Sequence, residues 1–130
     1  MSVKNTDKPA PLAGEPLVHA IIEALKDALA QNIVTIDIRN LPGATDWFVI
    51  CDGDNIVHNR ACADRVVDTL REEHTTRPWQ QEGSSEGRWI LLDYSDVVVH
   101  VMLDELRDFY DLEALWSGGI VTRIENDQVD

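Results

Sequence analysis

The sequence has few positive charges and no long apolar run. Its 130 residues include 11 Lys and Arg against 24 Asp and Glu, which gives a formal net charge of −13 at pH 7. A surface of this sign repels phosphate backbones, which argues against a protein that wraps DNA or RNA with high affinity. No apolar run reaches the roughly 20 residues of a membrane span, and none resembles the core of a signal peptide. We therefore expect neither a nucleic-acid wrapper nor a membrane protein.

Cysteine is also scarce. Cys51 and Cys62 are the two cysteines of the sequence, and no CxxC or Cys/His metal spacing occurs. This excludes a disulfide-rich scaffold and predicts a reduced chain in the cytoplasm. Either thiol could act as a nucleophile with His58 or His100 as its base, but both cysteines lie in apolar surroundings, so structural burial is the favoured interpretation.

Hydrophobic residues make up 44% of the sequence, enough for a core, and the length corresponds to one domain. Apolar periodicity and turn residues predict eight elements. In chain order these are a helix over 16–31, strands over 33–38 and 47–51, a helix over 56–74, strands over 77–82, 88–93 and 97–103, and one or two helical turns over 104–116.

This order of elements predicts an α/β (α+β) fold, a single domain with a mixed β-sheet of about five strands and helices packed on it. Residues 1–14 lack periodicity and are predicted to form a flexible N-terminal tail. The domain is expected over 15–117, and residues 118–130 are expected to form an acidic C-terminal tail.

Two motifs could hold a ligand. The turn at 53–55, between a strand and a helix, could bind phosphate through free N–H groups, but it lacks further glycines and a lysine, which favours a capped turn. The set Asp93, Asp96, His100 and Asp104 could bind Mg²⁺ or act in acid–base chemistry. In regular strands, however, the face that carries Asp93, Trp89 and Leu91 need not coincide with the face that carries His100.

Aromatic residues are concentrated near the C-terminus, interleaved with acids. Trp89, Tyr94, Phe109, Tyr110 and Trp116 are five of the eight aromatic residues, and all lie between positions 89 and 116. One interpretation is a C-terminal helix held on the sheet by its own aromatic side chains, which fits Phe109 and Leu112 best. The other is an interface with aromatic anchors and an acidic rim for a basic partner.

Four segments resemble a known family. They are D-W-F-V-I-C-D-G-D at 46–54, R-P-W-Q-Q-E-G at 77–83, W-I-L-L-D-Y-S-D-V-V-V-H-V at 89–101 and R-D-F-Y-D-L-E-A-L-W at 107–116. In order and spacing they are similar to the ribosomal silencing factor family, RsfS, also called Iojap, over roughly residues 17–117. One stretch departs from the family: members commonly carry Ser or Thr after the glycine, where this sequence has Asp54.

The resemblance implies a fold related to the nucleotidyltransferase scaffold without enzymatic activity, and no cofactor, nucleotide or metal. It implies binding to the large ribosomal subunit through large-subunit ribosomal protein fourteen. The bound factor is expected to block subunit joining and to repress translation when nutrients or energy are short. On the motif positions, the expected partner-binding residues are Trp89, Leu91, Asp93, Tyr94, Asp96, His100, Arg107, Phe109, Tyr110 and Trp116.

Two other functions remain open from the residues alone. One is a nucleotidyltransferase-like or metal-dependent phosphotransfer enzyme that uses Asp93, Asp96 and Asp104, although no D-x-D pair occurs on a predicted strand. The other is a homodimerisation module, because exposed aromatic residues also suit a self-complementary surface.

Overall fold

Two apolar segments form the centre of a sheet. β2 (Trp47–Gly53) and β5 (Val97–Leu103) run parallel to each other, in a register that pairs Trp47 with Val97 and Gly53 with Leu103. In both strands all but one or two residues are buried. Side chains on both faces of these strands are therefore covered, as continuous apolar sequence predicts for a central parallel pair.

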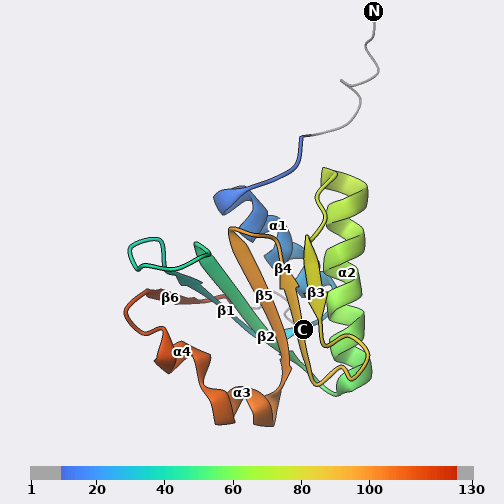
Figure 1. Ribbon diagram of the computed structural model, residues 1–130. Helices are drawn as coiled ribbons and strands as arrows, with labels where there is room; N and C mark the ends of the chain where they lie inside the picture. The colour runs from blue at the N-terminus through green and yellow to red at the C-terminus, as the bar shows by residue number, and fades with distance from the viewer. Residues whose placement is uncertain (1–9, 126–130) are drawn as a thin grey trace, which may run out of the picture.

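The computed structural model describes residues 10–125, which contain a six-stranded mixed sheet in the order β3-β4-β5-β2-β1-β6 (Figure 1). β1 (Gln31–Asp37) lies antiparallel to β2, and β4 (Trp89–Asp93) lies antiparallel to β5. The two edges are the short strands β3 (Gln80–Glu82) and β6 (Ile120–Arg123). The α/β fold class with a mixed sheet is thus confirmed.

Two long helices cover one face of the sheet. α1 (Gly14–Asp27) and α2 (Ile56–His74) pack on each other and on alternate side chains of the strands, which makes the larger of two buried clusters. α3 (Asp104–Tyr110) and α4 (Leu112–Leu115) are short and lie over part of the opposite face (Figure 1). Within the described residues, no helix is long and apolar enough to cross a membrane.

The turn between β2 and α2 is a capped strand-to-helix turn, as the sequence predicted. The Asn55 side chain accepts a hydrogen bond of 2.9 Å from the backbone N–H of His58. Behind it, the fully buried Asn59 accepts from the N–H of Gly53 at 2.9 Å and donates to the carbonyl of Gly87 at 2.8 Å. A Cβ on Gly53 would lie 2.5 Å from the Asn59 side chain, so glycine is required there.

The prediction of about five strands was one strand short. β6 lies within 118–130, the predicted acidic tail, and it pairs with β1 from Ile120 opposite Asp37 to Arg123 opposite Val34. Four residues carry too little periodicity to reveal a strand. Gly119 lets the chain pass close to β1, since a Cβ there would lie 2.7 Å from the Asp37 carbonyl. The predicted tail residues 1–9 and 126–130 lie outside the described residues.

Replacing Asn59 by Ala is expected to lower the free energy of unfolding by about 2–4 kcal/mol, because the N–H of Gly53 and the carbonyl of Gly87 would be buried without partners. Urea unfolding followed by circular dichroism measures this loss. The exposed Asn40 provides a matched control, and Asn40→Ala should change stability by no more than about 0.5 kcal/mol. Equal effects of the two substitutions would contradict the assignment.

Candidate functional site

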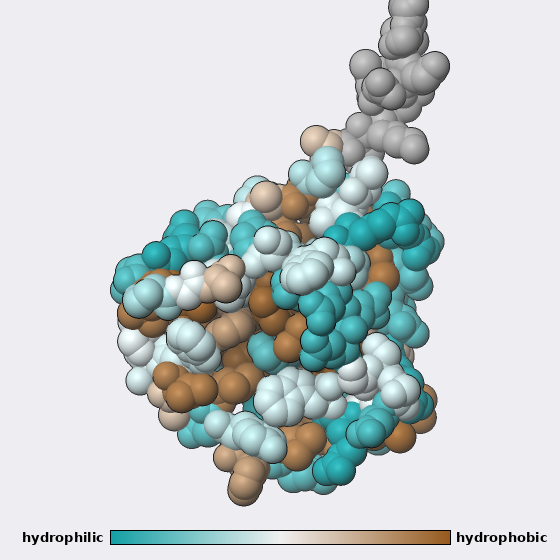
Figure 2. Space-filling model, viewed as in Figure 1, coloured by the Kyte–Doolittle hydropathy of each residue, from teal (hydrophilic) through white to brown (hydrophobic). Residues whose placement is uncertain are grey.

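The sheet face opposite α1 and α2 is only partly covered. Its inner part is a second buried cluster of Val34, Ile36, Ile38, Ile50 and Met102, against which α3 and α4 pack through Leu106, Leu112 and Trp116. Beyond these helices the face stays accessible, and Figure 2 shows hydrophobic residues gathered over the middle strands and over α3 and α4. We call the side chains of Phe48, Trp89, Leu91, Asp93, Val98 and His100 the open sheet face.

The register of β4 and β5 brings the predicted residues of both strands onto this one face. Leu91 lies directly opposite His100, and Asp93 lies directly opposite Val98. Residues opposite each other in a sheet project to the same side. The doubt that these two faces coincide was therefore unfounded: Trp89, Leu91, Asp93 and His100 do share a face. Periodicity fixes the alternation within each strand, but the pairing of two strands decides which sets meet.

His100 is held in one orientation by its aromatic neighbours. The Trp89 Nε1–H donates to Nδ1 of His100 at 3.0 Å, and the Phe48 ring meets the imidazole edge-on at a centroid distance of 5.2 Å. His100 is buried, which lowers its pKa to about 4. Because Nδ1 accepts a hydrogen bond, the neutral ring carries its proton on Nε2, which has no partner within residues 10–125. The imidazole is therefore an uncharged part of the open sheet face.

Aromatic contacts continue from the sheet to α3 and α4. The Tyr110 ring packs on the rings of Trp89 and Phe109, with centroid distances of 5.0 Å and 4.9 Å. The Trp116 and Phe48 rings lie 5.2 Å apart, again between centroids. We call Phe109, Tyr110, Leu115 and Trp116 the aromatic corner. Phe109 and Leu115 are 78% and 70% exposed, and Tyr110 is 49% exposed. Single exposed apolar residues are common on protein surfaces, but here they adjoin one another and the open sheet face, and a contiguous apolar patch marks a candidate interaction site.

The expectation that Phe109 clamps the C-terminal helix to the sheet was wrong, whereas Leu112 does pack against the sheet as expected. The reason lies in the break at Asp111, which adopts a left-handed conformation with φ of 46°. The break separates two short helices, and the side chains that reach the sheet are those of Leu106 and Leu112. Phe109 consequently projects away from it.

Two of the predicted partner residues lie elsewhere. Tyr94 is buried in the cluster beneath α1 and α2, on the other face of the sheet. The Asp96 carboxylate accepts a hydrogen bond of 2.6 Å from the N–H of Gly14, the first residue of α1. Asp93 accepts from the N–H of Ser95 at 2.8 Å and stabilises the turn between β4 and β5. Tyr94 and Asp96 therefore support the domain from the helical side.

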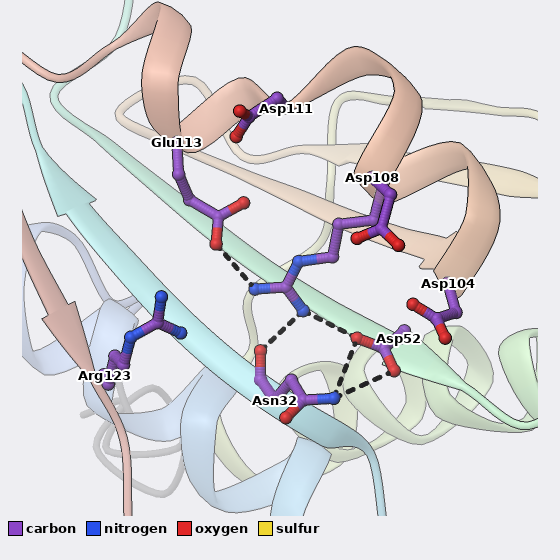
Figure 3. A pocket seen from close by; sticks show the side chains of 8 residues that line it. Asn32, Asp52, Asp104, Asp108, Asp111, Glu113 and Arg123 are labelled. Atoms are coloured by element: carbon purple, nitrogen blue, oxygen red, sulfur yellow. Dashed lines mark hydrogen bonds and ion pairs between the residues drawn. The ribbon is translucent and has the colours of Figure 1, made fainter.

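Arg107 also has a supporting position, in a buried ion network (Figure 3). Its Nη1 donates to the Asp52 carboxylate at 2.7 Å and to the Asn32 carbonyl at 2.6 Å, and its Nη2 donates to Glu113 at 3.1 Å. The Asn32 side chain donates to both Asp52 oxygens at 3.3–3.4 Å. One guanidinium thus joins β1, β2, α3 and α4.

This network is the floor of a polar cavity of about 280 Å³. Asp104, Asp108 and Asp111 line it from α3 and the turn that follows, and Arg123 faces them from β6 (Figure 3). Burial raises the pKa of Asp52, although Arg107 and Asn32 act in the opposite direction. Burial lowers the pKa of Arg107, but the hydrogen bonds and charges of Glu113 and Asp52 outweigh it and raise that pKa. The guanidinium therefore stays charged.

The acids of the phosphotransfer hypothesis are not grouped in the described part of the chain. Across residues 10–125, no three His, Cys, Asp or Glu side chains are grouped closely enough to bind a metal ion, so Asp93, Asp96 and Asp104 do not form the cluster that a phosphotransfer enzyme would use. Both cysteines are buried, as expected, and burial raises the pKa of Cys62 to about 11. A thiol in this state is a poor nucleophile at neutral pH.

Sequence reasoning missed Phe48, Leu115 and the partners of Arg107. Phe48 stood in a run that predicted a strand buried on both faces, so its exposure on the open sheet face was not expected. Asn32 and Asp52 are far from Arg107 in the chain, and only Glu113 is near it. The one available signal was Asp52 itself, an acid at the end of an apolar strand.

Replacing Arg107 by Met is expected to destabilise the domain by about 3–5 kcal/mol, because the Asp52 carboxylate would remain buried without its counter-ion. Denaturant unfolding at neutral pH measures the loss. Arg123→Met is the matched control: Arg123 lines the same cavity but is exposed, and its loss should cost no more than about 0.5 kcal/mol. If the two variants were equally stable, the network would have no structural role.

His100 predicts a specific pH dependence of stability. The folded protein keeps this imidazole neutral to about pH 4, whereas the unfolded chain binds a proton near pH 6.5. Lowering the pH from 6.5 to 4 therefore reduces the free energy of unfolding by about 3 kcal/mol through this group alone. Comparing the pH dependence of unfolding for the native chain and His100→Asn measures the difference, since other groups contribute to both. Parallel curves would rule the prediction out.

Comparison with known proteins agrees with this geometry. The profile of the family RsfS, described as "Ribosomal silencing factor during starvation", matches residues 11–130. Ribosomal silencing factors RsfS of Chromobacterium violaceum and Bacillus subtilis are 39% and 36% identical to this chain, over 75% and 72% of it and 79% of each relative. A mouse protein named "Mitochondrial assembly of ribosomal large subunit protein 1" is 28% identical over 77% of this chain and 45% of its own length.

Solved structures show the same fold. A crystal structure of a Chromobacterium violaceum protein superposes with a TM-score of 0.78 at 32% identity, and covers 90% of this chain and 98% of its own. A second, from Bacillus halodurans, gives a TM-score of 0.71 at 28% identity, over 86% of this chain and 99% of its own. The profile match covers nearly the whole sequence and the two bacterial silencing factors exceed 30% identity, so the chain belongs to the RsfS family of ribosomal silencing factors.

Proposed function

We propose that this protein represses translation by binding the large ribosomal subunit, through large-subunit ribosomal protein fourteen, and by blocking the joining of the subunits when nutrients or energy are short. The observation that carries the proposal is the continuous surface of the open sheet face and the aromatic corner, bordered by acids on a chain of net charge −13. Family membership and the names of the relatives support a ribosomal role.

The aromatic corner supplies the anchors for such a contact. Phe109, Tyr110 and Leu115 are exposed, and Tyr110 rests on Trp89 of the open sheet face. Large side chains held rigidly before binding lose little entropy when a partner covers them. Central aromatic anchors of this kind often contribute about 2 kcal/mol or more each to an interface. Trp89, Leu91, Asp93, His100 and Trp116 extend the same surface over the sheet.

Charge favours a basic partner. Asp104, Glu105, Asp108 and Asp111 are all exposed around the aromatic corner. In a particle whose RNA is uniformly negative, an acidic surface is repelled from the backbone and attracted to a basic ribosomal protein. The charge therefore orients the protein toward a protein contact on the large subunit. The mouse relative's name also refers to the large subunit of the ribosome.

The mechanism is steric and needs no catalytic residue. A factor that occupies the joining face of the large subunit excludes the small subunit, so the two binding events compete. At a free concentration equal to a hundred times its dissociation constant, the factor would weaken joining by about a hundredfold, or about 2.7 kcal/mol. Silencing is then set by affinity and abundance. A regulatory role of this kind agrees with the relatives, which are named as silencing factors.

Phe109→Ala is expected to weaken binding to purified large subunits by roughly thirtyfold, the equivalent of about 2 kcal/mol. The fold should be unaffected because the side chain is 78% exposed. Co-sedimentation with large subunits measures affinity, and sucrose-gradient profiles measure the yield of joined ribosomes. Val57→Ala removes an exposed apolar side chain from α2, on the helical side, and should bind like the native chain. Unchanged binding of Phe109→Ala, or normal joining at saturating protein, would disprove the proposal.

The acidic rim predicts that binding weakens with ionic strength. Raising the salt from about 0.05 M to about 0.5 M shortens the range of surface electrostatics several-fold. The affinity for large subunits should fall, and Glu105→Gln with Asp108→Asn should reduce both the affinity and its salt dependence. The competing enzyme hypothesis predicts instead that Mg²⁺ and nucleoside triphosphate bind with measurable heat in calorimetry. Such heat, together with salt-independent ribosome binding, would favour it.

A further inference from the structure

The helical layer carries a groove that the proposed ribosome contact does not use. It lies between α1 and α2, has a volume of about 390 Å³, and is on the side of the sheet opposite the open sheet face. The lining residues are Leu12, Pro16, His19, Ala20, Glu23, Ala24 and Asp27 from α1 and the segment before it, and Thr69, Glu73 and His74 from α2.

The floor of the groove is apolar and one border is acidic. Pro16, Ala20 and Ala24 recur every four residues on α1, so they follow one line along the helix and leave room above it. Glu23 and Asp27 lie on the adjacent line, and Glu73 faces them from α2. Among residues 10–125, no Lys or Arg lines the groove.

The carboxylates of the acidic border are available to a binding partner. Among the described residues, the carboxylates of Glu23, Asp27 and Glu73 form no ion pair. The groove is closed at one end, where the N–H of Leu12 donates to Thr76 beyond the end of α2 at 2.8 Å. From Pro16 to Asp27 it extends along twelve residues of helix, about 16 Å, which equals roughly three turns of a bound helix.

We propose that this groove is a second docking site, which binds a short amphipathic helix of a partner protein with apolar residues on one side and Lys or Arg along its edge. The small floor residues let the apolar side of such a helix approach α1 closely. The row of Glu23, Asp27 and Glu73 pairs with its basic edge. A helix with an acidic edge is excluded by the same charges.

The docking site is independent of ribosome binding because the two surfaces lie on opposite faces of the sheet. Contact with the large subunit through the open sheet face thus does not cover the groove. The chain then acts as an adaptor, and a basic amphipathic segment is brought to the subunit surface together with it.

The test uses the full-length, nitrogen-15-labelled protein and two synthetic peptides. The probe is an amphipathic helix about fourteen residues long, made of Leu, Ala and Lys, and the control peptide carries Glu in place of each Lys. The probe should shift the backbone amide signals of the α1 and α2 residues that line the groove, in a saturable manner. The glutamate peptide should not. Equal binding of both peptides, or shifts confined to the open sheet face, would overturn the proposal.

Variants locate the contact. Ala20→Trp fills the floor and should weaken probe binding at least tenfold, whereas Ala61→Trp, on an exposed position of α2 outside the groove, should not. Glu73→Lys should weaken binding about threefold at low salt, and Glu86→Lys, an exposed acid in the loop before β4, is its matched control. Glu73 is exposed, so this variant keeps the test valid if Ala20→Trp fails to fold.

Ribosome binding separates the two proposals. Ala20→Trp and Glu73→Lys should co-sediment with large subunits as the native chain does, and Phe109→Ala should bind the probe normally. Loss of large-subunit binding in the groove variants would show that the groove is part of the ribosome contact and overturn the independent site. Sedimentation that shows a dimer of the native chain, lost in Ala20→Trp, would assign the groove to a second copy and equally overturn the proposal.

Discussion

The buried guanidinium of Arg107 determines where the C-terminal part of the chain lies. It bonds to Asp52 at the end of β2, to the carbonyl of Asn32 in β1 and to Glu113 in α4. A buried ion pair contributes little net stability, because both charges lose their hydration. An arrangement that leaves one of the two charges buried without its partner strongly destabilises the fold. The network therefore works mainly by excluding other positions of α3 and α4. The exposed aromatic corner depends on it.

Two short helices alone could not hold such a corner. α3 has seven residues and α4 has four, too few for stable isolated helices. Their apolar contribution to the second cluster comes from a few partly buried side chains, Leu106, Leu112 and Trp116 among them. With the hydrophobic contact so small, the ion network and the aromatic contacts of Trp89 and Phe48 provide the remaining constraint on orientation. Phe109 and Leu115 can then remain exposed while their backbone is fixed.

The sheet separates two surfaces of different chemistry. One face is closed by α1 and α2, and the groove on their outer side combines an apolar floor with the carboxylates of Glu23, Asp27 and Glu73. The other face combines aromatic side chains, a neutral buried imidazole and exposed acids. Both surfaces carry exposed acids, in agreement with a net charge of −13, and both proposed contacts are therefore with basic protein partners.

The sequence by itself determined the fold class, most of the elements, the buried cysteines and the family, because these depend on local periodicity and on contiguous motifs. The boundaries of α2 and β5 agreed with the structure to within a residue or so. Tertiary structure alone decided which strand faces coincide, since the register of β4 on β5 is a pairing between segments. It also added β6, buried Tyr94 beneath α1 and α2, bound the Asp96 carboxylate to the start of α1 and exposed Phe109. Each of these outcomes depends on contacts between distant residues, which no local pattern encodes.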